Sequence, residues 1–521
     1  MLPPSFWQKF CKHPQAQWLL FGSALLGTAL VVGVGRHYRI DQVRCSSWPA
    51  LSTGLLSAPI YLLGLGLLTL GWLGLVQLLS SPATPARSTP STLRLLGVGL
   101  LMQLFGLLTP PFLSDDPLAY AAIGRAMAVY HQGSYVPLGQ SLPVGDPLRA
   151  LIQQYDGWLA VGSAYSPLFN WISAGLARLS GDSLRLQLQL FQVLGILCML
   201  ATALVTGEAA RQWFLGGGHL ARKSHPSMSA FAEAPIAEDA QQASWRIFRR
   251  ALALVLFCPL TLLEGTVNAH NDSLLALSIA LFCLCVVHRQ PVLATAALLL
   301  GPLVKASGVL ILGLYLLQLA CARLKLRLPA GRGPLLVIGG LALILMTALI
   351  TVGQDFLASY ISTLTKLIGS PADPYPYCTR SIECLPRAVL HMVLHLPRAS
   401  WLVGLFFRAL AGAFLLYMAT RAEHGLRFLT WVASFVFFYY LYLHGASHPW
   451  YVLSLLPLLP FASRRLLPAM LALPIANLAH YFLDFPYNCD LRPLTVGATE
   501  LVQALIVVVP STVLLLRARR L

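Results

Sequence analysis

Fourteen apolar runs of near-spanning length divide this 521-residue chain and constrain its fold more than any other feature. Hydrophobic residues make up 57% of the chain and charged residues only 11%, against roughly 25% charged residues in soluble domains. Several runs are short, so the sequence predicts an all-α polytopic membrane protein with 12–14 transmembrane helices. The runs cover residues 17–35, 53–80, 94–110, 187–206, 250–264, 273–288, 291–304, 307–321, 334–353, 400–420, 428–444, 450–463, 466–482 and 495–516.

The basic residues indicate how the chain crosses the membrane. The net charge of +17 suggests nucleic-acid binding at first, but Lys and Arg occur in short clusters between apolar runs. That pattern is the topology signal of an inner or plasma membrane protein. With the N-terminus inside, the inner segments hold 22 Lys and Arg residues and the outer segments 13. The first run lacks a small-residue cleavage site, so we interpret it as a span and not as a signal peptide.

This orientation predicts that the polar stretches with chemical potential share the outer face. The inner segment 207–249 is rich in Gly, Ser and Ala and is predicted to be a cytoplasmic linker. A second large outer loop, 354–399, alternates charges and prolines and is predicted to cover the site. The outer stretches are 110–186, 264–272, the turn around Lys305, 354–399 and 444–449.

The first large outer loop, 110–186, contains two adjacent carboxylates at the membrane edge, Asp115 and Asp116. Pro117 suits the first turn of a helix, which makes Asp116 a candidate N-cap. Adjacent carboxylates repel each other, so one of them could have a raised pKa and act as a general base. The alternative is that Asp116 only caps the helix while Asp115 is solvated. Arg125 could neutralise an anionic lipid head or pair with an acid.

Three later outer stretches carry polar groups at membrane depth. The stretch EGTVNAHND, 264–272, mixes donors, acceptors and titratable groups and favours a substrate site over a turn in which Asp272 caps the next helix. Lys305 interrupts an apolar sequence, so it either binds an anion or extends to the interface. The stretch around His448 and Trp450 suits an interfacial aromatic belt, or an edge that contacts sugar or phosphate.

The cysteines allow a disulfide but no zinc site. Cys378 and Cys384 lie in an outer loop and could form a disulfide in an oxidising compartment, or be unrelated thiols. No CxxC-type or close His/Cys spacing accompanies them. We find no phosphate-binding Gly loop of the nucleotide type.

The motifs together resemble the GT-C class of integral-membrane glycosyltransferases, and within it the bacterial polyprenyl-phosphomannose-dependent α-mannosyltransferases. The segment 116–124, DPLAYAAIG, is similar to the D-V-Y-S-Y-A-A-Q-G pattern of that branch. YSPL at 165–168 is similar to Y-G-P-L, and NAHND at 268–272 resembles G-G-H-N-D without its glycines. Lys305 and the segment PWY at 449–451 match a later Lys and a P-W-Y element.

The resemblance implies a polyprenyl-phosphate sugar donor, a glycan or lipid-linked glycan acceptor, and transfer of a hexose, with mannose favoured, on the outer side of the inner membrane. An outer-loop Asp would act as general base with inversion; motif alignment favours Asp116, whereas local helix chemistry would free Asp115. We predict donor contacts from Lys305, Arg125 and His448. The predicted sugar or acceptor contacts are Tyr120, Tyr165, His270, Asn271, Asp272, Trp450 and Tyr451.

Two other functions remain open alternatives, and no cofactor is predicted. A transporter or flippase of lipid-linked sugars would show an inverted repeat and broken helices at the midplane, and the sequence has no pseudo-symmetric halves. A ligase or polymerase with one large outer loop fits less well, because the candidate residues are spread over five outer segments. A divalent metal at the paired Asp residues lacks a third carboxylate ligand in the sequence, so none is predicted.

Overall fold

The protein is described by a computed structural model. It covers residues 16–37, 50–80, 89–153, 158–160, 162–218, 240–326, 381–388, 394–421, 427–444, 448–483 and 496–520, with a few single residues besides. The predicted run 334–353, Cys378, residues 219–239 of the predicted linker, and most of the predicted second outer loop lie outside the described residues.

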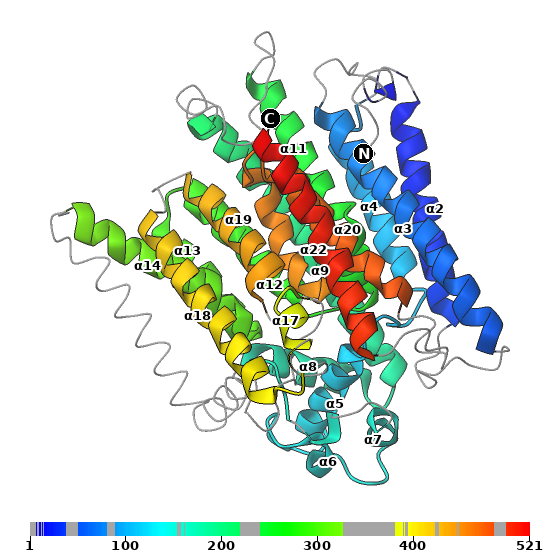
Figure 1. The fold of residues 1–521 in the computed structure, drawn as a ribbon. Coiled ribbons are helices and arrows are strands. Elements are labelled where there is room, and N and C mark those ends of the chain that lie inside the picture. The colour runs from blue at the N-terminus through cyan, green and yellow to red at the C-terminus, as the bar shows by residue number, and fades with distance from the viewer. Residues whose placement is uncertain are drawn as a thin grey trace.

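Long apolar helices form the bundle (Figure 1). Among the described residues, five helices are long and apolar enough to cross a membrane, or six if one bent pair counts as a span. The bent pair consists of α11 (Ala240–Leu256) and the π-helix η4 (Thr261–Val267), whose axes differ by 61°. The five long helices are α2 (Ala16–His37), α3 (Ala50–Ser80), α9 (Leu184–Trp213), α18 (Pro397–Arg421) and α22 (Val496–Arg520).

Shorter apolar helices fill the rest of the bundle. They coincide with the remaining predicted runs, and no strand occurs in the described part of the chain, so the predicted all-α polytopic fold is confirmed. The number of crossings stays a prediction, because these helices are shorter than the roughly 20 residues of a full span. They are α4 (Thr92–Gly106), α12 (Asp272–Val287), α13 (Pro291–Val304) with η5 (Ala306–Gly308), α14 (Val309–Leu326), α19 (Phe428–Phe438) with η8 (Tyr439–Leu443), η9 (Pro449–Phe461), and α20 (Leu467–Ala479) with η10 (His480–Leu483).

The predicted first outer loop folds into a small helical layer, called here the outer-loop layer, at one end of the bundle. Figure 1 shows this layer at the end opposite the marked chain termini. It has a core of its own, in which Tyr120 and Phe169 pack with Phe191 of α9. The layer comprises α5 (Asp116–Ala128), α6 (Leu138–Ser141), α7 (Pro147–Ile152), η2 (Trp158–Ala160) and α8 (Pro167–Ser180).

Glycines allow the closest helix contacts beneath this layer. A Cβ at Gly124 of α5 would overlap the carbonyl of Ser173 in α8, and a Cβ at Gly195 of α9 would overlap the carbonyl of Gly265 in η4. Gln192 of α9 donates to the carbonyls of Thr109 and Val267 at 2.9 and 3.0 Å. Backbone groups that are freed where a helix breaks inside an apolar bundle need other partners, and these side-chain bonds provide them. They fix η4 against α9, and with it the polar stretch that follows η4.

Candidate functional site

Segments far apart in the sequence meet where the outer-loop layer covers the bundle. Asp116 at the start of α5 faces His270, which lies between η4 and α12. His270 stacks on Trp450 of η9, and Lys305 after α13 lies over the ring of Tyr451. The Tyr165 ring packs edge-on against Tyr120 at 4.8 Å. The structure thus brings together one residue or more from each motif that carried the resemblance.

Asp116 does not cap its helix, so the N-cap prediction is wrong. Helix α5 begins at Asp116 itself, with Asp115 as the N-cap residue and Pro117 in the first turn. The Asp115 side chain makes no cap hydrogen bond; instead Ser114 Oγ accepts a hydrogen bond from the Asp116 backbone N–H at 3.3 Å. The Asp116 carboxylate is therefore available to side chains from other elements. Its Oδ2 accepts from Tyr120 Oη at 3.4 Å and lies 3.4 Å from His270 Nδ1.

His270 joins two carboxylates through its two ring nitrogens. Nδ1 faces Asp116, and Nε2 lies 3.2 Å from Oε2 of Glu264, whose side chain is also fully buried. Asn268 donates to the same Glu264 oxygen at 3.2 Å. The Asn268 Oδ1 in turn accepts from the backbone N–H groups of Phe112 and Leu113, at 3.3 and 3.2 Å. This chain of contacts ties the segment that leads into α5 to the end of the broken helix.

The charges in this cluster are set by competition between burial and pairing. Burial opposes ionisation of both Asp116 and His270, but their hydrogen bond and mutual attraction outweigh it. The pKa of Asp116 is lowered, with smaller contributions from Lys305 and Tyr165. The pKa of His270 is raised to about 9, with Glu264 as the second contributor. At neutral pH the structure therefore holds Asp116 as a carboxylate and His270 as an imidazolium, and the predicted raised pKa is wrong for Asp116.

Lys305 pairs with a buried carboxylate of the adjoining helix. Its Nζ lies 2.6 Å from Asp272 Oδ2, and the Asp272 side chain has no exposed surface. The same Nζ lies 4.2 Å from the centroid of the Tyr451 ring, within cation–π range. Asp272 is the first residue of α12, whose N-cap is Asn271, so the alternative in which Asp272 caps this helix is wrong.

Aromatic rings form one wall of the site. The Trp450 ring stacks on His270 at 4.1 Å and on His448 at 4.4 Å, with interplanar angles of 14° and 9°. Trp450 is only 9% exposed, which differs from the open position of an interfacial belt residue. Stacking on an imidazolium is favourable for the electron-rich indole face.

Several buried polar atoms of the site have no hydrogen-bond partner within the protein. They include both amide atoms of Asn271, Oδ1 of Asp272, Oε1 of Glu264 and Nε2 of His270, which lies at ion-pair distance from Glu264 Oε2 without hydrogen-bond geometry. Asn271 is 2% exposed, and an unpaired buried amide costs about 1–3 kcal/mol. Such groups concentrate where a protein later meets a ligand. The side chain of Asn271 can therefore serve a polar ligand without first breaking a bond.

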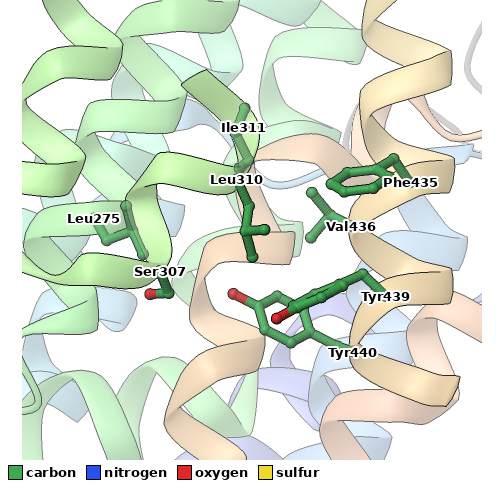
Figure 2. A pocket seen from close by; sticks show the side chains of 8 residues that line it. All are labelled: Leu275, Ser307, Leu310, Ile311, Phe435, Val436, Tyr439 and Tyr440. Carbon is green, nitrogen blue, oxygen red and sulfur yellow. The ribbon is translucent and has the colours of Figure 1, made fainter. Parts of the chain in front are cut away.

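A pocket with polar and apolar lining residues lies beside Ser307, which follows Lys305 by two positions in the chain (Figure 2). In Figure 2 the hydroxyl ends of Tyr439 and Tyr440 point toward Ser307. The opposite lining is apolar, and the Ser307 hydroxyl has no partner within the protein. The remaining lining residues are Leu275, Leu310, Ile311, Phe435 and Val436.

Arg125 lies in a separate charge cluster of the outer layer. Its Nε bonds Asp146 at 2.7 Å and its Nη1 bonds Asp182 at 3.0 Å. The buried Asp146 also accepts from Tyr130 Oη at 2.6 Å and from the Leu148 backbone N–H at 2.8 Å. These bonds outweigh burial and lower the pKa of Asp146. The structure thus gives Arg125 two carboxylate partners, and its predicted donor contact stays a prediction.

The remaining predictions concern cysteines and metal ligands. Cys384 is disulfide-bonded, but Cys378 lies outside the described residues, so their pairing stays a prediction. Among the residues that the structure describes, no group of three His, Cys, Asp or Glu side chains is arranged to hold a metal ion. The predicted site set lacked Glu264. The position of Glu264 at the end of an apolar run could have identified it. An acidic side chain is costly in a membrane and is therefore a candidate for function.

One comparison with known proteins identifies a family. Residues 17–216 match the family described as alpha-(1->6)-mannopyranosyltransferase, N-terminal domain. This range includes the outer-loop layer and α9, and so both Asp115 and Asp116. No curated protein matches the chain. Residues 17–216 are thus similar to the N-terminal domain of alpha-(1->6)-mannopyranosyltransferases, and this similarity supports a membrane hexosyltransferase of the mannosyltransferase kind.

Proposed function

We propose that this protein transfers a mannosyl group from a polyprenyl-phosphate sugar to a glycan or lipid-linked glycan acceptor, on the outer side of the inner membrane. The observation that carries the proposal is the meeting of the Asp116 carboxylate and the Lys305 ammonium group in one largely buried cluster. One group can accept a proton and the other can stabilise a phosphate. Both are needed for transfer from a sugar phosphate.

In the proposed step, Asp116 Oδ2 takes the proton of the acceptor hydroxyl as that oxygen bonds the anomeric carbon of the sugar. The bond from the anomeric carbon to the phosphate oxygen breaks, and its electron pair leaves with the phosphate. Attack opposite the leaving group inverts the anomeric centre. An alpha product, as in the family description, therefore requires a beta-linked donor. General-base assistance of this kind contributes about 10²–10⁴-fold in rate.

Two features support Asp116 over Asp115 as the base. The Asp116 carboxylate faces Tyr120 and His270, at the centre of the cluster. Its lowered pKa keeps it ionised, and able to accept a proton, at neutral pH. Asp115 occupies the N-cap position of α5.

The donor would bind with its phosphate near Lys305. The apolar side chains beside Ser307, among them Leu310 and Ile311, would contact the first part of its lipid (Figure 2). The unpaired amide of Asn271 would bind sugar hydroxyls, and the Trp450 and Tyr451 rings would pack against the sugar faces. His448 and Arg125 are proposed as secondary phosphate contacts.

The outer placement rests on the charge distribution and on the arrangement in Figure 1. The outer-loop layer and the chain termini lie at opposite ends of the bundle. An N-terminus on the inner side, as the Lys and Arg count favours, would put α5–α8 outside. Lipid-linked sugars are the activated donors suited to a compartment without nucleotides.

The test is to incubate the purified protein in lipid nanodiscs with a panel of polyprenyl-phosphate sugars and to identify which donor is consumed. We expect mannose transfer, lost by at least 100-fold in Asp116→Asn and retained within 10-fold in Asp115→Asn. Full activity of Asp116→Asn would refute the assigned base. Movement of lipid-linked sugar across the bilayer without transfer would favour a flippase.

A further inference from the structure

The fully buried carboxylate of Glu264 has no place in the transfer step, yet it lies beside the proposed base. Its Oε2 is 3.2 Å from His270 Nε2, while His270 Nδ1 is 3.4 Å from Asp116 Oδ2. Three side chains from different parts of the fold are therefore in consecutive contact. They are Glu264 of η4, His270 of the segment between η4 and α12, and Asp116 of α5. A membrane protein that only needed to fill this volume would place an apolar side chain there, because a buried carboxylate is costly.

We propose that Glu264 is a positioning residue that acts through His270 to hold the catalytic carboxylate of Asp116 in place. The proposal rests on the proposed function of Asp116. Both ring nitrogens of His270 lie at ion-pair distance from a carboxylate. A carboxylate has only acceptors, so a neutral imidazole would turn a lone pair toward one of the two, whereas an imidazolium turns an N–H and a positive charge toward both. Glu264 thus selects the doubly protonated ring, and the second N–H holds Asp116.

Other contacts fix the ring in this orientation. Trp450 stacks on one face of His270, with His448 on the same indole. Tyr120 Oη lies 3.3 Å from Nδ1 and also bonds Asp116. Because Asn268 holds the Glu264 oxygen, the carboxylate cannot turn away from the ring without breaking that bond.

The charged and titratable groups around His270 set its pH response. Asp116 and Tyr120 of α5, Glu264 of η4 and Asp272 of α12 face the His270 ring. The other titratable groups nearby are Tyr165, Lys305 and His448, the last of which lies on the indole ring of Trp450. The pKa of His270 is raised to about 9, because burial is outweighed by its interactions with Asp116 and Glu264. The imidazolium therefore predominates below about pH 9 and is lost above it. The transfer rate should show an alkaline limb there, in addition to an acid limb from Asp116.

Glu264→Gln separates the charge of this residue from its shape. The Gln amide can donate to Nε2 of a neutral ring, whose Nδ1–H still bonds Asp116, so the orientation is kept while the need for an imidazolium is removed. We expect the alkaline limb near pH 9 to disappear and the acid limb of kcat/KM to move up by at least half a pH unit, with kcat at pH 8 within 10-fold of wild type. Glu264→Asp, which retains the charge, should retain the alkaline limb.

The matched control is Glu208→Gln, in the same helix bundle but paired with Arg211 near the far end of α9. We expect its pH profile to superimpose on the wild-type profile. A wild-type profile for a folded Glu264→Gln variant would overturn the proposal. If that variant does not accumulate, His270→Gln provides the same test, because an alkaline limb that persists without the imidazole refutes the role. Activity of Asp116→Asn would refute the proposed base itself, whereas an inactive Asp116→Asn with an unchanged Glu264→Gln profile refutes only this inference.

Discussion

Removing Lys305 tests the buried ion pair on which the phosphate site depends. Lys305→Met keeps most of the side-chain volume but removes the charge. Asp272 Oδ2 then loses its partner at 2.6 Å, and Oδ1 already has none in the protein. A fully buried carboxylate is left uncompensated, in contrast to a surface pair, for which water would replace the lost cation.

The structure allows the cost to be estimated. Removing one member of a buried pair typically costs about 3–5 kcal/mol, and the position of Asp272 in the first turn of α12 recovers about 1 kcal/mol through the helix dipole. We therefore expect Lys305→Met to lower the free energy of unfolding by about 2–4 kcal/mol. Asp272→Asn should cost only about 1–2 kcal/mol, since the Lys305 ammonium remains over Tyr451 and partly reaches the surface.

The assay is a double-mutant cycle by denaturant unfolding in detergent micelles, followed by tryptophan fluorescence. The double variant should cost less than the sum of the single variants, with a coupling energy of about 2–3 kcal/mol. The partly exposed Arg211–Glu208 pair is the matched control, for which we expect less than 1 kcal/mol. A coupling energy under about 0.5 kcal/mol for Lys305 and Asp272 would refute the reasoning. In refolded or stabilised samples, Lys305→Met should also lose transfer by about 10²–10³-fold, as expected for a lost charge-stabilising group.

Three further variants test other parts of the structure. Tyr120→Phe removes the hydroxyl bonded to the proposed base but keeps the buried ring, so we expect a roughly 10-fold loss of kcat with under about 1.5 kcal/mol change in stability; an unchanged kcat would exclude the contact. Gly124→Ala inserts a methyl group into the backbone of α8 and should cost about 1–3 kcal/mol; proteolysis of the outer layer at the wild-type rate would contradict this packing. Arg125→Gln leaves Asp146 with its Tyr130 and backbone donors only, so we expect thermal unfolding to show about 2–3 kcal/mol of destabilisation. An unchanged stability would contradict the ion pair. A raised KM for the sugar donor in the same variant would support the predicted phosphate contact.

The fold class was predictable, and so was the selection of residues that lie together in the candidate site, because both depend on patterns that the membrane enforces. An apolar run must become a helix where no water can satisfy its backbone, so helices occur where the runs predicted them. Polar groups at membrane depth are rare and cluster around function, so Lys305 and the stretch 264–272 could be selected before their contacts were known. Their meeting with Asp116 agrees with the predicted placement of these stretches on one face of the membrane.

The pairings within the site were not predictable, because each depends on a distance that no local pattern encodes. The sequence favoured Asp116 as a helix cap, but the helix starts one residue earlier than that requires, and Ser114 binds the backbone N–H. The expected raised pKa assumed two isolated carboxylates; a histidine 154 positions further along supplies the cation that lowers it. Asp272 likewise has a distant partner, Lys305. The predictions from neighbouring residues thus failed where a charged partner far away in the sequence determines the state of the carboxylate.

The proposed transfer moves one negative charge across this cluster, and the ion pairs lie at the two ends of that movement. Before the step, Asp116 is ionised beside the His270 imidazolium. Afterwards Asp116 carries the acceptor proton, and the added charge lies on the leaving phosphate, proposed to bind near Lys305. A single cation would stabilise only one of these states and would raise the barrier to the other. With a cation near each end, the cost of the negative charge is lowered in both states, in a site of low dielectric constant where such a charge is most costly.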